Sequence, residues 1–144
     1  MTGRILLVED SPEAVELTKH ALEGCSLESK AIKVAYDGQD ALDYLFAAGR
    51  YEGRETAELP EVVLLDLRLP KVDGFEVLEQ IRSNSRTKLV PVVMLTVSKL
   101  RDDITRAYEL GANSYIVKAI DYDVYHDTIT AACAYWLKLN RRPY

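Results

Sequence analysis

Residues 4–12 read RILLVEDSP, a short apolar run that ends in two acidic residues and is followed by a serine and a proline. The apolar run is typical of a buried β-strand. Ser11 can cap a helix, and Pro12 fits the first helical turn because its missing N–H has no hydrogen bond to lose there. Small and apolar residues then recur at helical spacing as far as Gly24, which favours a helix end: Ala14, Leu17, Thr18, Ala21 and Leu22. The stretch therefore predicts a strand that leads directly into a helix.

The same succession of strand and helix recurs four times along the chain. Apolar runs predict further strands at residues 31–36, 62–66, 90–95 and 114–117. The helices expected after them are marked by Ala41, Leu45, Ala48 and Gly49, by Gly74, Phe75, Leu78 and Ile81, by Ile104, Ala107, Leu110 and Gly111, and by Asp121 and Leu139 at the two ends of the last. Strands that are apolar throughout are buried on both faces and run parallel. The pattern predicts an α/β fold, a doubly wound five-stranded parallel sheet in the flavodoxin-like order 2-1-3-4-5, with helices on both faces.

Length and composition indicate one domain. The chain has 144 residues, of which 48% are hydrophobic and 28% charged, a balance typical of a soluble domain with a single core. We expect residues 1–144 to form this domain, with a short extension after the last helix. The polar segment 50–60 is long for a connection in such a fold, and we interpret it as a tolerated surface insertion rather than a dedicated binding loop.

Charge and hydropathy exclude several classes of protein. Acidic residues outnumber basic ones by 23 to 18, which gives a net charge of −5 and argues against general nucleic-acid binding. The apolar runs are far shorter than the roughly 20 residues of a membrane span. The N-terminus lacks the features of a signal peptide, so we expect a cytoplasmic protein that binds neither membranes nor nucleic acid. Cys25 and Cys133 form no CxxC motif and are interpreted as packing thiols.

Polar side chains stand at the carboxyl ends of four predicted strands. Glu9 and Asp10 end the first strand, Asp66 the third, Thr96 the fourth and Lys118 the fifth. In a flavodoxin-like sheet, ligands bind beyond these ends, next to the first and third strands. Each residue alone has a structural explanation, such as capping the next helix, but the five together at one edge indicate a functional site.

Three carboxylates in one crevice repel one another unless a cation joins them. Mg²⁺ takes one or two carboxylates and completes its coordination with water and other oxygens, so we expect Asp10 and Asp66 as direct ligands and Glu9 acting through water, with Mn²⁺ as an alternative ion. The Thr96 hydroxyl and the Lys118 ammonium would hold the oxygens of a phosphoryl group. One of the carboxylates could then attack phosphorus and form an acyl phosphate.

Four segments resemble those of a known family: LLVEDSPE at 6–13, VVLLDLRLPKVDGFEVL at 62–78, VVMLTVS at 92–98 and GANSYIVK at 111–118. In order and spacing they look like the receiver domain of two-component response regulators, over essentially the whole chain. The resemblance implies that a sensor histidine kinase phosphorylates Asp66 and that the protein signals by a conformational change. It also implies self-catalysed phosphoryl transfer and autodephosphorylation rather than an enzyme with a separate substrate.

The resemblance assigns a role to each site residue. The implied magnesium ligands are Glu9, Asp10, Asp66 and the backbone carbonyl of Arg68. Lys118 would pair with the phosphate, while Thr96 and Tyr115 would form the switch pair that changes the surface of helix four, strand five and helix five. Because no residues follow the last helix to form a DNA-binding module, we expect the output to pass through a partner protein.

Two features refine the resemblance and two depart from it. The insertion at 50–60 and the tail YWLKLNRRPY at 135–144 resemble the stand-alone regulators paired with bacterial phytochrome kinases. The family usually follows its lysine with a cis-proline, whereas this chain has Ala119, so the bond is either trans or a cis bond that costs about 2.5 to 4 kcal/mol. The residue after the threonine is usually small, but Val97 is β-branched and would narrow the route of water to an acyl phosphate.

Three other functions can be weighed against this one. A hydrolase of the haloacid dehalogenase type also uses an aspartate nucleophile and Mg²⁺, but it needs a second acid two residues later, where this chain has Arg68. A dinucleotide or flavin binder needs a glycine-rich first turn, but this chain has EDSPE. A degenerate receiver that binds partners without being phosphorylated remains the strongest alternative.

The last predicted helix has more apolar surface than one sheet can cover. A helix that rests on a sheet needs one apolar stripe, but here Tyr122, Tyr125 and Trp136 fall on one side and Tyr135 on another. Tyr and Trp often dominate interface energetics. We therefore predict a homodimer through the face of helix four, strand five and helix five, with these four residues at its interface. The alternative is that the tail covers its own sheet.

Overall fold

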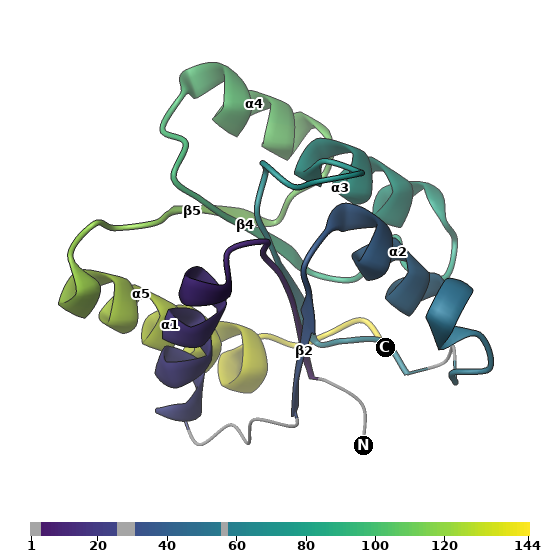
Figure 1. Ribbon diagram of the computed structural model, residues 1–144, viewed down its shortest axis with the longest axis horizontal. Helices are drawn as coiled ribbons and strands as arrows, with labels where there is room; N and C mark the ends of the chain where they lie inside the picture. The colour runs from purple at the N-terminus through teal and green to yellow at the C-terminus, as the bar shows by residue number, and fades with distance from the viewer. Residues whose placement is uncertain (1–3, 26–30, 56–57) are drawn as a thin grey trace.

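The chain forms a five-stranded parallel sheet, seen in a computed structural model that describes residues 4–25, 31–55 and 58–144 (Figure 1). The strands are β1 (Ile5–Val8), β2 (Ile32–Ala35), β3 (Val62–Leu65), β4 (Val92–Thr96) and β5 (Ser114–Val117). They lie in the order β2-β1-β3-β4-β5, and every neighbouring pair is parallel. The predicted sheet and its strand order are confirmed.

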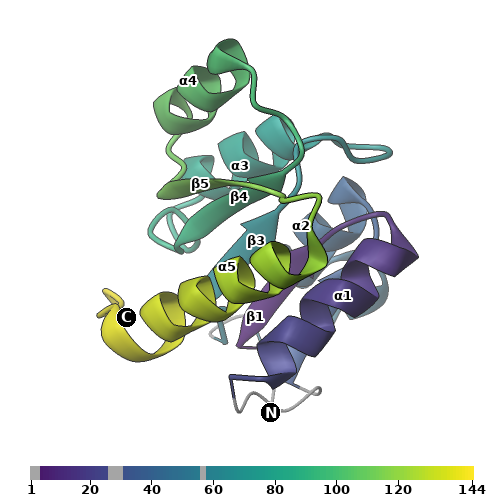
Figure 2. The same ribbon diagram turned by 90° about the vertical axis from the view of Figure 1, so that its left-hand side faces the viewer.

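Helices cover both faces of the sheet (Figures 1 and 2). One face packs against α1 (Pro12–Glu23) and α5 (Tyr122–Ala134), and the other against α2 (Gly38–Phe46), α3 (Gly74–Ser83) and α4 (Arg101–Glu109). Neighbouring strand residues point to opposite faces, so Ile5 and Leu7 contribute to the α1/α5 core while Leu6 and Val8 contribute to the other. Burial on both sides explains why the strands are apolar throughout.

Helix α1 begins as the sequence predicts, but its buried stripe is rotated. Ser11 Oγ accepts a hydrogen bond from the Ala14 backbone N at 3.3 Å, and Pro12 is the first helical residue. Thr18, Ala21 and Leu22 are buried as expected, and Val15 joins them. Leu17 is 37% exposed and Ala14 is half-buried, contrary to the prediction, because the helix turns Val15 rather than these residues toward the core it shares with α5.

Two helix ends differ from the prediction. Helix α2 stops at Phe46 because Ala47 adopts a left-handed conformation with φ 54°, so Ala48 is exposed rather than buried. Asp121 caps α5 by accepting a hydrogen bond from the Val124 backbone N at 3.0 Å, but the α-helix ends at Ala134 and residues Tyr135–Leu139 form a π-helical segment. No helix in the described ranges has the length and apolar character needed to cross a membrane.

The insertion packs against α2 and β2. A 3₁₀ turn at Gly49–Tyr51 sets the ring of Tyr51 edge-on to that of Tyr44, with centroids 5.3 Å apart. The Arg54 guanidinium lies 4.0 Å from the Tyr44 centroid, and the Lys33 ammonium lies 4.6 Å from the Tyr51 centroid. Cation–aromatic contacts of this kind attach the segment to the domain. Residues 56 and 57 of the predicted insertion lie outside the described residues.

The C-terminal tail returns to the amino end of the sheet (Figure 1). The Tyr144 hydroxyl donates a hydrogen bond to the Pro60 carbonyl at 2.7 Å. Glu61, just before β3, forms ion pairs with Arg142 at 3.1 Å and with Arg4 at 2.5 Å. The tail therefore contacts its own domain. This is part of what the alternative to the dimer prediction describes, in which the tail covers its own sheet.

Candidate functional site

Three carboxylates converge where β1 and β3 end. Glu9 and Asp10 follow β1, Asp66 follows β3, and the register that pairs Val8 with Leu65 sets the two ends side by side. One oxygen from each carboxylate lies within 4.8 Å of the other two. Glu9 and Asp66 are buried, at 3% and 9% exposure, while Asp10 is exposed. The structure thus brings together the three acids that the sequence placed at this edge.

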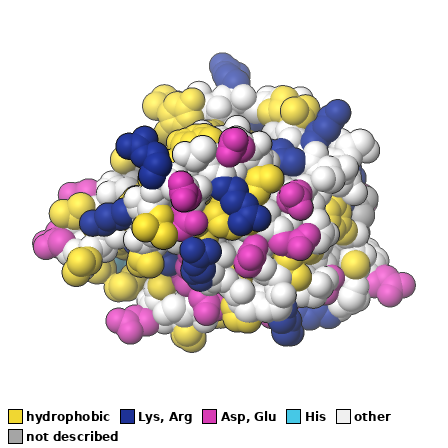
Figure 3. Space-filling view, turned by 90° about the horizontal axis from the view of Figure 1, so that it is seen from above, with side chains coloured by type: hydrophobic (Ala, Val, Ile, Leu, Met, Phe, Trp, Pro, Cys, Tyr) yellow, Lys and Arg dark blue, Asp and Glu magenta, His cyan; other side chains and the backbone are white. Residues whose placement is uncertain are grey.

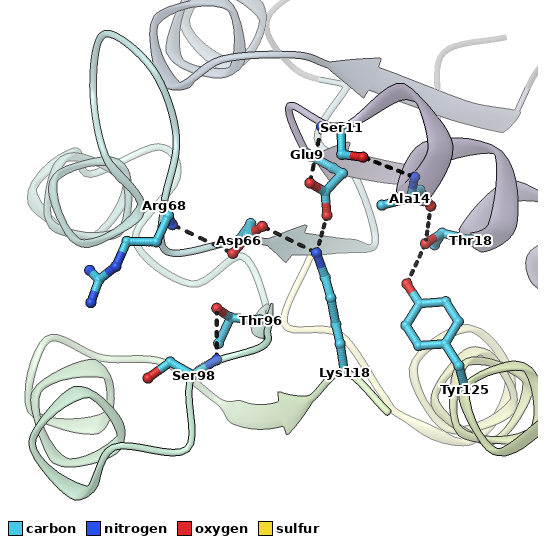
Figure 4. Close-up of polar contacts among 10 residues, drawn as sticks. All are labelled: Glu9, Ser11, Ala14, Thr18, Asp66, Arg68, Thr96, Ser98, Lys118 and Tyr125. Carbon is cyan, nitrogen blue, oxygen red and sulfur yellow. Dashed lines mark hydrogen bonds and ion pairs between the residues drawn. The ribbon is translucent and has the colours of Figure 1, made fainter. Parts of the chain in front are cut away.

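Lys118 reaches this cluster from the end of β5 (Figure 4). Its ammonium donates to Glu9 Oε1 and to Asp66 Oδ2, the latter at 3.1 Å. The other oxygen of Glu9 accepts a hydrogen bond from the Ser11 backbone N at 3.2 Å. One ammonium thereby bridges the carboxylates of two strands, and it is itself almost buried, with 12% of its side chain exposed.

Burial is the largest influence on the protonation equilibria of Glu9 and Lys118. Burial raises the pKa of Glu9 above its usual 4.5, and the hydrogen bond and charge of Lys118 offset only part of this increase. Burial alone would lower the pKa of Lys118, but the hydrogen bond to Glu9 and the charge of Asp66 raise it overall. A cluster of three carboxylates close together fits a divalent ion such as Mg²⁺ or Mn²⁺, which would neutralise their charges.

The turn after Asp66 depends on a glycine. The Gly74 backbone N donates to the Leu67 carbonyl at 2.8 Å, so the start of α3 lies directly against the loop that follows β3. A Cβ atom at Gly74 would lie 2.2 Å from the Asp66 carbonyl oxygen, which the backbone could not accommodate. Within this turn the Arg68 backbone N lies 3.5 Å from Asp66 Oδ1. The LPKVDG sequence therefore positions the aspartate carboxylate.

Thr96 and Tyr115 are connected through the loop that follows β4. Thr96 is fully buried, and its Oγ1 accepts a hydrogen bond from the Ser98 backbone N at 3.4 Å (Figure 4). Tyr115, on β5, donates its hydroxyl to the Ser98 carbonyl at 3.0 Å, and burial raises the pKa of this tyrosine. Both members of the predicted switch pair thus bond to Ser98, which the sequence analysis did not select.

Asp103 is a second residue that the sequence analysis missed. It lies in the first turn of α4 and accepts a hydrogen bond from Ser98 Oγ at 2.6 Å. Its carboxylate also pairs with the guanidinium of Arg68 at 3.1 Å. An acid in a first helical turn is ordinary, so nothing in the sequence distinguished Asp103 from its neighbours.

The predicted interface residues do not share one surface. Tyr122 and Tyr135 are exposed, at 42% and 48%, and Trp136 is partly buried against the α1/α5 core. Tyr125 is only 6% exposed, and its hydroxyl lies 2.5 Å from Thr18 Oγ1. Its assignment to a partner surface is wrong because α1 covers it.

The structure also describes the two residues that depart from the family pattern, Ala119 and Val97. No peptide bond among the described residues is cis, so the Lys118–Ala119 bond is trans. Val97 is 71% exposed and lines an apolar pocket with Lys118, Ile120 and Tyr122.

The fold and the site together define a class of phosphoryl-accepting signalling domains. In this class a buried aspartate lies between a lysine and two further acids at the carboxyl edge of a doubly wound sheet. Residues 5–130 match the response regulator receiver domain, and the chain belongs to this family. It is 43% identical over 139 residues to the "Probable methanogenesis regulatory protein FilR2" of Methanothrix harundinacea, covering 96% of this chain and 86% of that protein. It is 37% identical over 134 residues to "Response regulator Rcp1" of Synechocystis, covering 93% and 88%.

Solved structures show the same fold. The Mn²⁺-bound form of Rcp1 has a TM-score of 0.88 at 35% identity, over 97% of this chain and 98% of that one. The phosphorylated cyanobacterial phytochrome response regulator RcpA has a TM-score of 0.88 at 33% identity over the whole of both chains. The bacteriophytochrome response regulator RtBRR has a TM-score of 0.77 at 43% identity, over 99% of this chain and 85% of that one.

Proposed function

We propose that Asp66 accepts a phosphoryl group from a sensor histidine kinase and that the phosphorylated chain is the signalling state. The observation that carries this proposal is the place of Asp66 between the Lys118 ammonium and the carboxylates of Glu9 and Asp10. The residue is 9% exposed, and its hydrogen bond from Lys118 holds the carboxylate in one orientation. Membership of the receiver family supports this reading.

The acidic cluster would hold the divalent ion. The proposed ligands are Asp10 and Asp66 directly, Glu9 through water and the backbone carbonyl of Arg68. When bound, Mg²⁺ or Mn²⁺ would neutralise oxygens of the phosphoryl group during transfer. The carboxylate oxygens of the cluster suit such a hard ion, and the solved structure of Rcp1 is described as Mn²⁺-bound.

The remaining polar residues would bind the transferred group and pass on its presence. Lys118 already donates to Asp66 and can keep one hydrogen bond to a phosphoryl oxygen. Thr96 would turn its hydroxyl from the Ser98 backbone toward the phosphoryl group, and the bond from Tyr115 to the Ser98 carbonyl would respond. In this role the chain is a self-modifying switch rather than an enzyme with a separate substrate.

Mass spectrometry after incubation with acetyl phosphate tests the assignment. The chain should gain one phosphoryl group only when Mg²⁺ or Mn²⁺ is present, and Asp66→Asn should gain none. Asp127→Asn removes an exposed carboxylate on α5 and serves as the matched control. Equal labelling of Asp66→Asn would overturn the assignment, and an unlabelled native chain would favour the degenerate receiver.

The proposed phosphodonor is a sensor kinase of the phytochrome type. RcpA and RtBRR are named as phytochrome and bacteriophytochrome response regulators, and their folds superimpose on nearly the whole of this chain. In this proposal residues 1–144 act as one cytoplasmic receiver domain whose insertion at 50–60 and extension after α5 are parts of the domain. Phosphotransfer from a phytochrome kinase should be much faster than from an unrelated histidine kinase, and equal rates would contradict the pairing.

We propose a homodimer through the α4, β5 and α5 face, without Tyr125. The exposed candidates are Tyr122 and Tyr135, and a groove between β5 and α5 is lined by Ile116, Tyr135 and Trp136. Light scattering should give a dimer at tens of micromolar, and Tyr135→Ala combined with Trp136→Ala should dissociate it. A monomer in both the unmodified and the phosphorylated chain would refute the dimer.

A further inference from the structure

The loop beside the site contains an ion pair that the proposed chemistry does not use. The Arg68 guanidinium lies 3.1 Å from Asp103 Oδ2 and joins the β3–α3 loop to the first turn of α4. Figure 4 shows the Arg68 side chain pointing away from Asp66, although its backbone N faces that carboxylate. The pair spans 35 residues of sequence, so it is a tertiary contact and not a local one.

The same carboxylate fixes the loop that carries the switch residues. Asp103 Oδ2 accepts the Ser98 hydroxyl at 2.6 Å, and the Ser98 carbonyl accepts the Tyr115 hydroxyl at 3.0 Å. Arg68, Asp103, Ser98 and Tyr115 therefore form a continuous chain of polar contacts from the phosphoacceptor loop to β5. A change at Arg68 would therefore affect Ser98, because both residues bond to the carboxylate of Asp103.

The charges of the site favour a new partner for Arg68 after phosphorylation. The three carboxylates, Lys118 and a divalent ion together are close to neutral. Conversion of the Asp66 carboxylate to an acyl phosphate adds roughly one negative charge and three acceptor oxygens. The guanidinium matches phosphoryl oxygens in geometry and charge, and it is 61% exposed, so the pair that it leaves is a weak one. Figure 3 shows acidic and basic side chains close together on the face seen from above.

We propose that Arg68 is an exchangeable phosphoryl ligand: Asp103 holds its guanidinium in the unmodified chain, and phosphorylation of Asp66 draws it to the phosphoryl oxygens. The exchange leaves Asp103 without its cation and, through the bond of Asp103 to Ser98, loosens the loop to which Thr96 and Tyr115 bond. Asp103 thereby competes with the phosphoryl group for Arg68. This inference rests on the proposed phosphorylation of Asp66 and names the residue that transmits it to α4.

Competition for Arg68 predicts that two variants change the affinity for a phosphoryl mimic in opposite directions. Beryllofluoride with Mg²⁺ can serve as the probe, because it mimics a phosphoryl group on an aspartate carboxylate, and its affinity can be measured by calorimetry. Arg68→Gln should weaken binding by about tenfold because it removes a charge-assisted contact. Asp103→Asn should tighten binding several-fold because it frees Arg68. In the Arg68→Gln background, Asp103→Asn should have no effect.

Asp102→Asn is the matched control, since Asp102 is a neighbouring exposed acid in the same first turn of α4. It should leave the affinity unchanged, which separates competition for Arg68 from a general effect of charge at the start of the helix. Hydrogen exchange gives a second readout. The amides of residues 98–103 should exchange faster when the native chain binds the probe, and Arg68→Gln and Asp103→Asn should show this faster exchange without it.

The outcomes separate this inference from the proposed function. If the native chain neither binds beryllofluoride nor gains phosphate, the proposed function fails and this inference fails with it. If the native chain is modified at Asp66 but Arg68→Gln and Asp103→Asn shift the affinity in the same direction, only the exchange is overturned. The same conclusion follows if Asp103→Asn still acts in the Arg68→Gln background, because the effect would then not pass through Arg68.

Discussion

The two ends of the sheet each contain a charged residue between two opposite charges, but only the carboxyl end is the proposed phosphorylation site. At the carboxyl end Lys118 lies between Glu9 and Asp66, and the three side chains are 4% to 12% exposed. At the amino end Glu61, which is 14% exposed, lies between Arg4 and Arg142, which are 37% and 35% exposed. The arrangement of charges is similar, and the two central residues are about equally buried, so the difference lies in the access of the flanking charges to water.

Burial makes the carboxyl end electrostatically sensitive. Burial raises the pKa of Glu9 because it disfavours the charged carboxylate. Charges that water cannot screen also interact strongly, so an added cation or phosphate would affect the neighbouring groups. The pairs at the amino end are screened, and exposed ion pairs of this kind contribute less than about 1 kcal/mol. We therefore expect substitutions at the two ends to differ in kind. Those at the carboxyl end should slow phosphorylation, and those at the amino end should slightly lower the free energy of unfolding.

The largest effect is expected for Lys118→Met, which removes the charge and keeps most of the aliphatic length. Loss of a preorganised donor to a phosphoryl group should slow phosphorylation by acetyl phosphate about 10²-fold. The variant should still bind Mn²⁺, since its carboxylates remain, and this binding shows that the site is folded. Glu61→Gln at the amino end is the control and should be phosphorylated at the native rate. A comparable loss in both variants would refute the contrast between the ends.

The pH dependence of metal binding tests the effect of burial directly. A metal ion must displace the proton from a carboxylate ligand or its hydrogen-bonded neighbour. The pKa of Glu9 is raised by burial, so this residue stays protonated to a higher pH than an ordinary glutamate. Mn²⁺ affinity, measured by calorimetry between pH 8 and 5, should therefore begin to fall while the pH is still above 4.5.

Glu9→Gln provides the matched comparison for this titration. The variant should bind Mn²⁺ more weakly at pH 8, and its affinity should fall less steeply as the pH is lowered. Identical slopes in the two proteins would show that Glu9 does not control the metal site.

Dephosphorylation gives a smaller effect at the same end. Val97 is 71% exposed and lines a pocket with Lys118, where its branched side chain would narrow the route of water to an acyl phosphate. Val97→Ala should lose phosphate a few-fold faster, as followed by mass spectrometry after removal of the donor. Leu17→Ala, which trims another wall of the same pocket on α1, is the control and should change the lifetime less. An equal or slower loss in Val97→Ala would remove the steric argument.

The sequence predicted those parts of the molecule that follow from local pattern. Apolar runs located all five strands, and polar residues at the strand ends located the acidic cluster and Lys118, because parallel strands bring their carboxyl ends to one edge. Capping by Ser11 was also predicted, and its side chain accepts a hydrogen bond from the backbone N three residues later. The start of the last helix near Asp121 was predicted as well, although its capping role was not.

The sequence could not predict contacts that join distant segments through side chains. Tyr125 has the composition of an interface residue, but the packing of α1 against α5 buries it and places its hydroxyl against Thr18, 107 residues away. The ion pair between Arg68 and Asp103 could not be predicted for the same reason, because neither residue differs in the sequence from other charged residues. The end of α2 was missed because Ala47 adopts a left-handed conformation that alanine rarely takes.

The smallest effect is expected for the tail at the amino end. Burial raises the pKa of Tyr144 to about 12, so the folded chain favours the neutral phenol that donates to the Pro60 carbonyl. Because the folded pKa is higher than the usual 10, docking of the tail is fully favourable below pH 10 and is lost as the pH rises toward 12. Tyr144→Phe should remove this dependence and, like Arg142→Ala, lower the free energy of unfolding by at most about 1 kcal/mol. Denaturant unfolding at pH 8 and at pH 11 would measure both effects, with phosphorylation by acetyl phosphate at pH 8 unchanged in each variant. A slower phosphorylation in either variant would mean that the two ends of the sheet communicate, and the contrast between a screened pair and a buried site would no longer explain their behaviour.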